Sequence, residues 1–416
     1  MTICVIGLGY VGLPLAVSFA EAYKVIGFDI NERRINELNS SFDNTYEVSK
    51  QEIINSQITF TNSEEDLKNI DIFIVTVPTP VTTDKKPDLS MLTNASELVG
   101  KKLSQDNIVV FESTVFPGCT EEICIPILEK ESGLLLNKNF GVGYSPERIN
   151  PGDKAHSFKT ISKVISASDN SFLDKIEEIY SKVINAEIFR AKSIKVAEAS
   201  KIIENTQRDI NIALMNEFST ILSKMNIRTK DVLDAASTKW NFINFEPGLV
   251  GGHCIGVDPY YLAFKADKLG IKPKVILAGR ETNNMMPNFI IEKVLSEKNL
   301  PSPEVLILGL TFKENCPDIR NSKSFDLIRE LNLKGIKPHI SDIYINASDL
   351  TNERIDADFI DNLEKHAGCF DILFFLVPHD EYIEKGYSFF KTLLKADGYF
   401  FDLKSKFESQ LTNGSL

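Results

Sequence analysis

The chain has 416 residues, with 46 basic and 58 acidic side chains and a formal net charge of −12 at pH 7. This length exceeds that of one ordinary hydrophobic core and predicts two or three domains. The acidic balance disfavours a nucleic-acid-binding surface as the main activity, although it allows a local basic pocket for an anionic ligand. The six cysteines show no CxxC pair and no zinc-finger spacing, so we expect reduced thiols, no bound metal and a cytoplasmic protein. We find no signal-peptide pattern and expect no membrane span.

Short runs rich in β-branched residues alternate with helical patterns through the first half of the chain. The runs are TICVIG, KVIGFD, IDIFIVTVP, NIVVFES and FGVGYS. Such apolar runs are typical of strands that are buried on both faces of a parallel sheet. The alternation predicts a series of βαβ units and therefore an α/β fold with a doubly wound sheet.

A glycine-rich segment, GLGYVG at residues 7–12, follows the first predicted strand and precedes a helical pattern. Glycines at such a turn let the backbone approach the pyrophosphate of a dinucleotide at the start of the helix. Asp29 ends the next strand, where its carboxylate can accept hydrogen bonds from a ribose and would repel a 2′-phosphate. NAD is therefore favoured over NADP, although Arg33 and Arg34 nearby leave NADP open. The alternative is that the glycines only form a tight turn.

One long helix is predicted over residues 194–225, because this segment contains neither Pro nor Gly, and such a helix can join two domains. Lys201, Asn205 and Arg208 fall on one of its faces. A lysine there would stabilise an oxyanion and Asn205 would donate a second hydrogen bond, although solvated helices often carry such a polar stripe. The apolar residues beside the stripe would pack against a second subunit or within one subunit.

A cysteine lies in the glycine-flanked loop GGHCIGVDP, residues 251–259. The thiol of Cys254 can attack an aldehyde, and the resulting thiohemiacetal can lose hydride to NAD and become a thioester that water hydrolyses. Asp258 would then be an acid, a base or an orienting group. The alternatives are that Cys254 is only a small loop residue and that Asp258 caps a helix at Pro259.

Two further loops follow predicted strands, at the edge where doubly wound sheets bind ligands. ESTVFPG contains Thr114, and YSPERINPG contains Glu147. Thr114 could instead cap a helix, and Glu147 could pair with Arg148 at the surface. His253 is another candidate base, but a histidine beside glycines is often a loop contact, so it ranks below the lysine and the aspartate.

Strands resume near the C-terminus with EVLILGL, KPHIS, DILFFLV and GYFFDLK. Their alternation with helical patterns predicts a second, smaller α/β domain.

Together these motifs resemble the UDP-glucose/GDP-mannose dehydrogenase family. The resemblance covers nearly the whole chain and rests on seven segments in the family's order: GLGYVGLPLA, VPTP, ESTVFPG, SPERINPG, KIIENTQRDINIALMNE, GLVGGHCIGVDPYYL and LGLTFKENCPDIRNS. It implies an NAD-dependent, four-electron sugar-nucleotide 6-dehydrogenase with two Rossmann-like doubly wound domains joined by a long central helix. The implied boundaries are 1–187 for an NAD-binding domain, 188–297 for a central dimerisation domain with the catalytic lysine and the cysteine loop, and 298–416 for a UDP-sugar-binding domain.

The resemblance also implies roles for individual residues. Cys254 matches the nucleophile and Asp258 the carboxylate that assists it. The catalytic set is completed by Lys201 and Asn205, which steady the oxygen on the reacting carbon, and by Thr114 and Glu147, which orient water for thioester hydrolysis. The implied cofactor contacts are Gly7, Gly9, Tyr10, Val11, Gly12, Asp29, Arg34, Thr79, Thr114 and Arg320. The implied sugar-nucleotide contacts are Glu147, Arg148, Lys201, Asn205, Arg208, Gly251, His253, Phe312, Lys313, Lys404 and Arg280, of which the last matches an arginine that reaches the substrate of the neighbouring subunit.

One departure bears on the substrate. UDP-glucose members carry a second glutamate four residues after the one that Glu147 matches, but this chain has Pro151 there. SPERINPG, ENTQRDINIAL and GGHCIGVDPYYL instead resemble the UDP-N-acetylgalactosamine and UDP-N-acetylglucosamine 6-dehydrogenases of bacterial surface-polysaccharide synthesis, of the O-antigen or capsule type. We therefore expect a homodimer that oxidises a UDP-N-acetylhexosamine at C6, without nucleic-acid or membrane partners. A UDP-N-acetylmannosamine or UDP-glucose dehydrogenase is the nearer alternative, and a non-catalytic NAD or sugar-nucleotide sensor is the alternative of another class.

Overall fold

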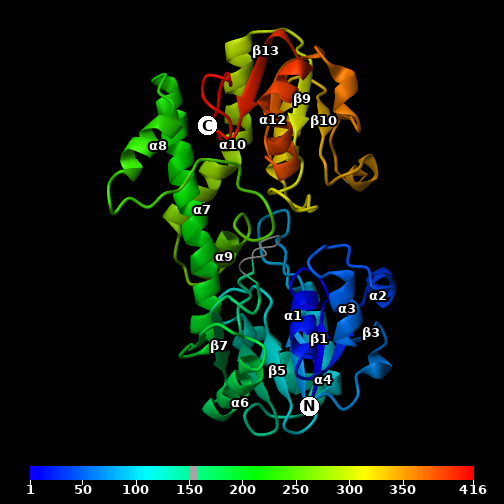
Figure 1. Cartoon of the computed structure of the whole chain (residues 1–416). Helices are drawn as coiled ribbons and strands as arrows, with labels where there is room; N and C mark the ends of the chain where they lie inside the picture. The colour runs from blue at the N-terminus through cyan, green and yellow to red at the C-terminus, as the bar shows by residue number, and fades with distance from the viewer. Residues whose placement is uncertain (150–156, 352) are drawn as a thin grey trace. The chain divides into compact units, whose positions relative to one another are not determined.

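A computed structural model describes the chain except for residues 150–156 and 352. The described chain divides into two units, which share the long helix α7 (Ile194–Lys224) in sequence (Figure 1). The first unit comprises Met1–Glu204 and Tyr260–Lys272, and the second comprises Asn205–Pro259 and Pro273–Leu416.

An eight-stranded sheet forms the centre of the first unit, in the order β3-β2-β1-β4-β5-β6-β7-β8. Neighbouring strands are parallel except β6 and β7, which are antiparallel. The first six strands in this order have the topology of a dinucleotide-binding fold. The strands are β1 (Thr2–Ile6), β2 (Lys24–Phe28), β3 (Thr59–Thr61), β4 (Ile72–Val75), β5 (Ile108–Phe111), β6 (Gly141–Tyr144), β7 (Lys163–Ala167) and β8 (Ile188–Arg190).

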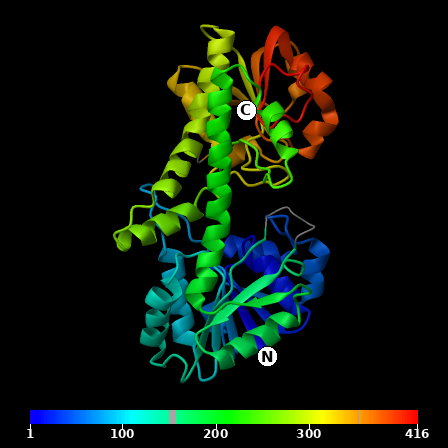
Figure 2. The same ribbon diagram turned by 90° about the vertical axis from the view of Figure 1, so that its left-hand side faces the viewer.

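Helices pack on both faces of this sheet, because successive strand residues point to opposite faces. Ile3 and Val5 of β1 share one buried cluster with Leu13 of α1 and Ile176 of α6. On the other side of the sheet, α4 and α5 pack against each other (Figure 2). The helices are α1 (Gly12–Ala20), α2 (Glu32–Asn39), α3 (Lys50–Ser56), α4 (Ser90–Lys102), α5 (Ile125–Ser132) and α6 (Asn170–Ser181), with a 3-10 turn at Glu64–Asp66 and a π-helical turn at Thr120–Cys124.

The second unit contains a five-stranded parallel sheet in the order β11-β10-β9-β12-β13. Val305 and Ile307 of β9 face α10 and α11 in one cluster, whereas Leu306 and Leu308 face α12 in another. The strands are β9 (Val305–Leu308), β10 (His339–Ser341), β11 (Asp358–Phe359), β12 (Phe370–Phe375) and β13 (Leu394–Asp402). The helices are α8 (Thr229–Ser237), α10 (Lys274–Lys298), α11 (Lys323–Leu333) and α12 (Asp380–Leu393), with 3-10 turns at Ala347–Leu350 and Leu363–His366. Helix α9 (Asp258–Lys268) begins in this unit and continues in the first.

The expected fold class is confirmed, since two mainly parallel sheets with helices on both faces are connected in sequence by a long helix. Helix α7 spans nearly the predicted range. The sequence interpretation missed the short strands β3, β7, β8 and β11, of which β7 carries a site residue described below. The three domain boundaries stay predictions, and Pro151 lies outside the described residues. Within the described part of the chain, we find no helix whose length and apolar character would suffice to cross a membrane.

Candidate active site

The turn between β1 and α1 leaves its backbone open to a ligand. A Cβ at Gly12 would lie 1.8 Å from the carbonyl oxygen of Gly7, so only glycine lets the helix start this close to the strand. A Cβ at Gly9 would meet no protein atom within 4 Å, so this position faces open space. No side chain caps α1 and its first turn holds no acidic residue, so its backbone N–H groups can receive a pyrophosphate. This turn therefore fits NAD.

Asp29 follows β2 and is held by two backbone donors. The N–H of Leu8 donates to its Oδ2 at 2.9 Å, and the N–H of Asn31 donates to its Oδ1 at 2.9 Å. Because a carboxylate has about four acceptor positions, both oxygens keep room for a ribose hydroxyl. Asp29 is only partly buried, as a ribose contact requires.

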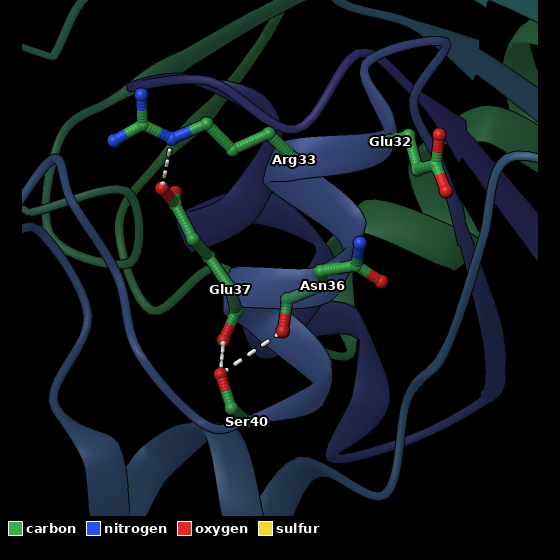
Figure 3. Close-up of a pocket in the computed structure, with 5 residues that line it drawn as sticks. All are labelled: Glu32, Arg33, Asn36, Glu37 and Ser40. Carbon is green, nitrogen blue, oxygen red and sulfur yellow. Dashed lines mark hydrogen bonds and ion pairs between the residues drawn. The ribbon is translucent and has the colours of Figure 1, made fainter.

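Arg33 and Arg34, which kept NADP as a possible cofactor, both bind other residues of the protein. Arg34 is 6% exposed, and its Nε donates to the carbonyl oxygen of Leu8 at 2.8 Å while its Nη2 lies 2.8 Å from Oδ1 of Asp43. Arg33 lies on the surface of α2, where its Nε donates to Oε1 of Glu37 at 2.9 Å (Figure 3). The pocket drawn in Figure 3 lies along the outer face of α2, since it is lined by Glu32, Arg33, Asn36, Glu37 and Ser40. Arg34 supports the glycine turn through Leu8, and its direct contact with the cofactor stays a prediction.

The loops after β4 and β5 are joined by side-chain hydrogen bonds. The hydroxyl of Thr79 donates to the carbonyl oxygen of Thr114 at 2.6 Å. The hydroxyl of Ser113 donates to the carbonyl oxygen of Val77, also at 2.6 Å. The buried phenol of Tyr261 donates to the carbonyl oxygen of Thr79 at 2.7 Å. The next helical segment starts at Thr120, so Thr114 is not its N-cap. Thr114 is only partly buried, which leaves it available to a ligand at the edge of the sheet.

Glu147 belongs to a buried cluster of charged side chains at the ends of β5 and β6. Its Oε1 accepts the backbone N–H groups of Arg148 at 2.7 Å and Ile149 at 2.6 Å, and its Oε2 accepts from Nζ of Lys163 at 3.1 Å. The same ammonium lies 2.6 Å from Oε2 of Glu112. Burial alone would raise the pKa of the Glu147 carboxyl, but Lys163 and the two backbone donors hold it below its ordinary value. Glu147 is therefore an ionised acceptor that can orient water.

Sequence reasoning missed Lys163 and Glu112 as members of this cluster. Burial raises the pKa of Glu112 to about 7, although Lys163 opposes the shift. Glu112 stands at the start of ESTVFPG, so its place in a quoted segment was the available signal. Lys163 opens the unpredicted strand β7, and nothing in its local pattern distinguishes it from a solvated lysine.

The guanidinium of Arg148 pairs with Glu204 and not with Glu147. Its Nε and Nη2 each lie 3.1 Å from an oxygen of Glu204 on α7, and its Nη1 donates to the carbonyl oxygen of Ser162 at 2.9 Å. The alternative in which Glu147 forms a surface pair with Arg148 is therefore wrong.

On α7 itself Lys201 is 8% exposed and belongs to the first unit, whereas Asn205 belongs to the second.

Cys254 is a partly exposed cysteine, not joined in a disulfide, in a turn of the second unit. Its carbonyl oxygen accepts the N–H groups of Val257 at 3.0 Å and Asp258 at 2.8 Å, which leads the chain into α9. The carboxylate of Asp258 is almost fully buried, and its Oδ2 accepts from the side-chain amide of Asn205 at 2.6 Å. Asp258 is therefore the first residue of α9, and its carboxylate holds Asn205. Its catalytic role stays a prediction.

A second loop of this unit, residues 311–322, lies against the cysteine loop. The N–H of Gly252 donates to the carbonyl oxygen of Asn321 at 3.2 Å, and a Cβ at Gly251 would lie 2.6 Å from that oxygen. The rings of His253 and Phe312 meet edge to face at 5.5 Å. The predicted contacts that gather around these two loops are Gly251, His253, Phe312, Lys313, Arg320 and Lys404, of which Arg320 pairs with Asp318 and Lys404 with Glu314.

Two predicted substrate arginines differ in exposure. Arg280 is 3% exposed, and its Nη1 lies 2.6 Å from Oδ1 of Asp209 in the same chain. That aspartate also accepts from Asn283 at 2.7 Å, so Arg280 belongs to a polar network between α7 and α10. Arg208 is exposed on α7. Contacts of either arginine with a substrate, including one in a neighbouring subunit, stay predictions.

Three models of one protein family match the chain in order. The models describe the NAD binding domain, the central domain and the UDP binding domain of the UDP-glucose/GDP-mannose dehydrogenase family, and they match residues 1–184, 195–285 and 306–409. Together they span most of the chain.

Individual relatives are similar over almost their full lengths. The chain is 50% identical to protein CapL of Staphylococcus aureus, in an alignment covering 99% of this chain and 98% of CapL. It is 47% identical to the UDP-N-acetyl-D-glucosamine 6-dehydrogenase of Pseudomonas aeruginosa, covering 97% and 96%. Among solved structures, the UDP-D-ManNAc dehydrogenase of Pyrococcus horikoshii matches with a TM-score of 0.87 at 29% identity, covering 98% and 96%.

Proposed function

We propose a substrate and a mechanism for this chain, which belongs to the UDP-glucose/GDP-mannose dehydrogenase family and is an NAD-dependent UDP-sugar dehydrogenase. The substrate is a UDP-N-acetylhexosamine, UDP-N-acetylglucosamine or UDP-N-acetylgalactosamine, and the product is its C6 uronic acid for surface-polysaccharide synthesis. The identity of 47% to a UDP-N-acetyl-D-glucosamine 6-dehydrogenase supports the substrate class. The single structural observation that carries the mechanism is the accessible thiol of Cys254, four residues before a buried carboxylate that holds Asn205.

In the proposed mechanism, Cys254 retains the sugar between two oxidations. NAD, when bound at the glycine turn of residues 7–12, would supply the oxidising power for the two hydride removals at C6, one molecule for each. Lys201 and Asp258 hold the water that takes the proton of the C6 hydroxyl, and the thiolate of Cys254 then adds to the aldehyde carbon. Lys201 and Asn205 donate hydrogen bonds to the oxygen that becomes negative in this step.

Hydrolysis of the thioester completes the reaction. Water adds to the carbonyl carbon, the carbon–sulfur bond breaks and the sulfur of Cys254 takes up a proton. Glu147 and Thr114 orient this water. The ionised state of Glu147 supports this role, because an acceptor-only carboxylate can hold a water molecule by one of its hydrogens.

Replacing the nucleophile tests the mechanism directly. We expect Cys254→Ala to abolish uronate formation, because no thioester can form. The matched control is Cys369→Ala, which removes an exposed free thiol of the same unit and should keep wild-type turnover. The measurement is NADH formed per mole of UDP-sugar under anaerobic conditions, with the uronate quantified. Two NADH per sugar in the wild type support the relay, and full uronate yield from Cys254→Ala would sink it.

The same titration separates the alternatives. A panel of UDP-N-acetylglucosamine, UDP-N-acetylgalactosamine, UDP-N-acetylmannosamine and UDP-glucose ranks substrates by kcat/KM. The likeness to a UDP-D-ManNAc dehydrogenase structure keeps the mannosamine substrate in the panel. A sensor would bind ligands and form no NADH with any of them.

We also propose a cytoplasmic homodimer. Large apolar side chains of the second unit are exposed on and after α7, among them Leu214, Phe218, Ile221, Met225 and Trp240. Leu214, Phe218 and Ile221 recur every three or four residues and so share one face of α7. A second copy of the chain is the proposed partner of this exposed apolar face. We expect the wild type to sediment as a dimer and Phe218→Glu with Ile221→Glu to sediment as a monomer. Monomeric wild-type protein at micromolar concentration would contradict the proposal.

A further inference from the structure

A buried histidine of the second unit ties the loop at residues 311–322 to the neighbouring sheet. His379 lies between β12 and α12 and is fully buried. Its Nδ1 accepts the backbone N–H of Asn315 at 3.0 Å, and Oδ1 of Asn315 accepts the backbone N–H of Asp380 at 3.0 Å. These two bonds brace Asn315 in a left-handed backbone conformation with φ of +56°, a region in which asparagine is enriched among the residues other than glycine.

The contacts at the other ring nitrogen define the tautomer. Nε2 of His379 lies 3.2 Å from Oδ2 of Asp342 and 3.3 Å from Oγ1 of Thr311. The hydroxyl of Thr311 donates its single hydrogen to the carbonyl oxygen of Lys313 at 2.9 Å, so towards the ring it can only accept. Since Nδ1 accepts and Nε2 faces two acceptors, the imidazole is neutral and carries its hydrogen on Nε2.

Protonation of this ring would break the tie to the loop. An imidazolium carries a hydrogen on Nδ1 as well, and that hydrogen would point at the N–H of Asn315. The carboxylate of Asp342 faces the other ring nitrogen, Nε2, at 3.2 Å. The other titratable groups around the ring come from the segments packed against it, and they are Lys313 and Cys316 on the loop, Tyr344 after β10, and Asp380, Glu381 and Tyr382 on α12.

The tied loop is part of the region matched by the UDP binding domain model, residues 306–409. Phe312 lies under Gly252, where a Cβ would come within 2.7 Å of its ring, and Asn321 accepts from the same glycine. The N–H of Phe312 donates to the carbonyl oxygen of Asp318 at 2.9 Å, which closes the loop on itself. A shift of the backbone at Asn315 would therefore displace the neighbouring Lys313 and the segment that precedes Cys254.

We propose that neutral His379 is a positioning residue that holds the loop at residues 311–322 in the conformation that binds the UDP-sugar, and that protonation of His379 releases the loop and weakens binding in acid. This inference rests on UDP-sugar binding by the second unit. It does not depend on which hexosamine is oxidised or on the Cys254 relay, so binding can test it without turnover.

The test is the dissociation constant of UDP-N-acetylglucosamine, measured by titration calorimetry between pH 8 and pH 5.5. Each phosphate of a UDP-sugar carries one ester bond and shares the anhydride bond, so neither has a second ionisable hydroxyl and the ligand itself does not titrate in this range. We expect the constant of the wild type to rise about tenfold on acidification, the effect of losing one buried hydrogen bond. His379→Gln keeps an acceptor and a donor but cannot be protonated, so it should bind like the wild type at pH 8 and stay within about threefold at pH 5.5. His379→Leu should bind about tenfold more weakly at every pH.

Two results would overturn the proposal. One is an equal pH dependence in the wild type and in His379→Gln, and the other is wild-type affinity in His379→Leu. NAD affinity, measured at the same pH values, is the control and should not follow the histidine. Hydrogen exchange of residues 311–319 gives a readout without ligand, because acid should reduce protection in the wild type and not in His379→Gln. Equal protection in both proteins at pH 5.5 would also contradict the proposal, whatever the behaviour of the leucine variant.

Discussion

The two units build the same turn after the first strand of each sheet and then use it differently. In the first unit Gly7 has φ of +92°, its N–H donates to Phe28, and the next N–H donates to Asp29 at 2.9 Å. In the second unit Gly309 has φ of +94°, its N–H donates to Ser341, and the next N–H donates to Asp342 at 2.6 Å. Both aspartates therefore fix the turn that follows β1 or β9.

The difference lies in what surrounds each carboxylate and each helix start. Asp29 is partly exposed, whereas Asp342 is 8% exposed and is held by His379 and by the N–H of Tyr344 at 2.8 Å. The helix of the first unit begins at Gly12 without a side-chain cap, but the hydroxyl of Ser322 caps α11 in the second. The same local turn thus leaves an uncapped helix start that fits a pyrophosphate in the first unit, whereas in the second unit the helix start is capped by a side chain. The residues around the turn make this difference.

The largest effect should come from adding a side chain to the glycine turn of the first unit, residues 7–12. A Cβ at Gly12 would overlap the carbonyl oxygen of Gly7 at 1.8 Å, so Gly12→Ala must displace backbone. We expect NAD affinity to fall about a hundredfold or more, which corresponds to about 3 kcal/mol. Gly9→Ala meets no protein atom, so it should weaken NAD about tenfold with an unchanged Tm. Calorimetric titration with NAD measures both.

UDP-sugar affinity provides the internal control for these variants, because the UDP binding domain model matches residues 306–409 of the second unit, far in sequence from Gly9 and Gly12. Wild-type NAD binding by Gly9→Ala would show that the pyrophosphate does not approach this glycine. A parallel loss of UDP-sugar binding would show a general loss of folding.

The parts that could be predicted from the sequence are those encoded by short-range patterns. The glycine spacing at residues 7–12 and the carboxylate at Asp29 follow from one βαβ unit, and Cys254 with Asp258 share one loop. The long helix followed from the absence of Gly and Pro. Because each feature depends on residues close in sequence, a single chain is enough to find it.

The parts that could not be predicted are pairings between distant segments. Lys163 meets Glu112 from 51 positions away, and His379 meets Asp342 from 37 positions away. Each of these residues has an ordinary local pattern, and a buried pair of polar side chains becomes visible only when the strands are placed side by side. Arg34 also has a partner that its local pattern did not show, since the fold pairs it with Asp43, and its contact with the cofactor stays a prediction.

A second experiment sharpens the contrast between the two aspartates. Asp342→Ala removes the acceptor for Leu310 and Tyr344 inside the protein, so we expect it to lower the free energy of unfolding by about 2–3 kcal/mol. Asp29→Ala should cost less than about 1 kcal/mol of stability, because solvent can reach that site, and should instead weaken NAD binding. Thermal denaturation and NAD titration of both variants measure the contrast. Equal losses of stability would mean that Asp29 is as structural as Asp342.

The two units should also differ in how buried carboxyls respond to pH. In the first unit, burial raises the pKa of Glu198 on α7 to about 7, although its carboxylate accepts the N–H groups of Gly118 and Thr120. The folded state then holds a proton that the unfolded state loses above about pH 4.5, so this contribution to stability is complete below that pH and is lost as pH rises through about 7. In the second unit, burial opposes ionisation of Asp342, but His379 and backbone donors lower its pKa, so its contribution is lost only as pH falls below the ordinary range.

Glu198→Gln tests this sign in the first unit. Glutamine keeps an acceptor for the start of the π-helical turn at Thr120–Cys124 but does not titrate, so the fall in stability between about pH 5 and 8 should shrink by up to about 3 kcal/mol. Glu65→Gln is the control, because Glu65 is exposed and should leave the slope unchanged. Part of the slope should persist in Glu198→Gln, since the pKa of Glu112 is raised in the same direction by burial. A Glu198→Gln protein with the full wild-type slope would assign the pH dependence to Glu112 alone and would mean that Glu198 is ionised in the folded state at every pH tested.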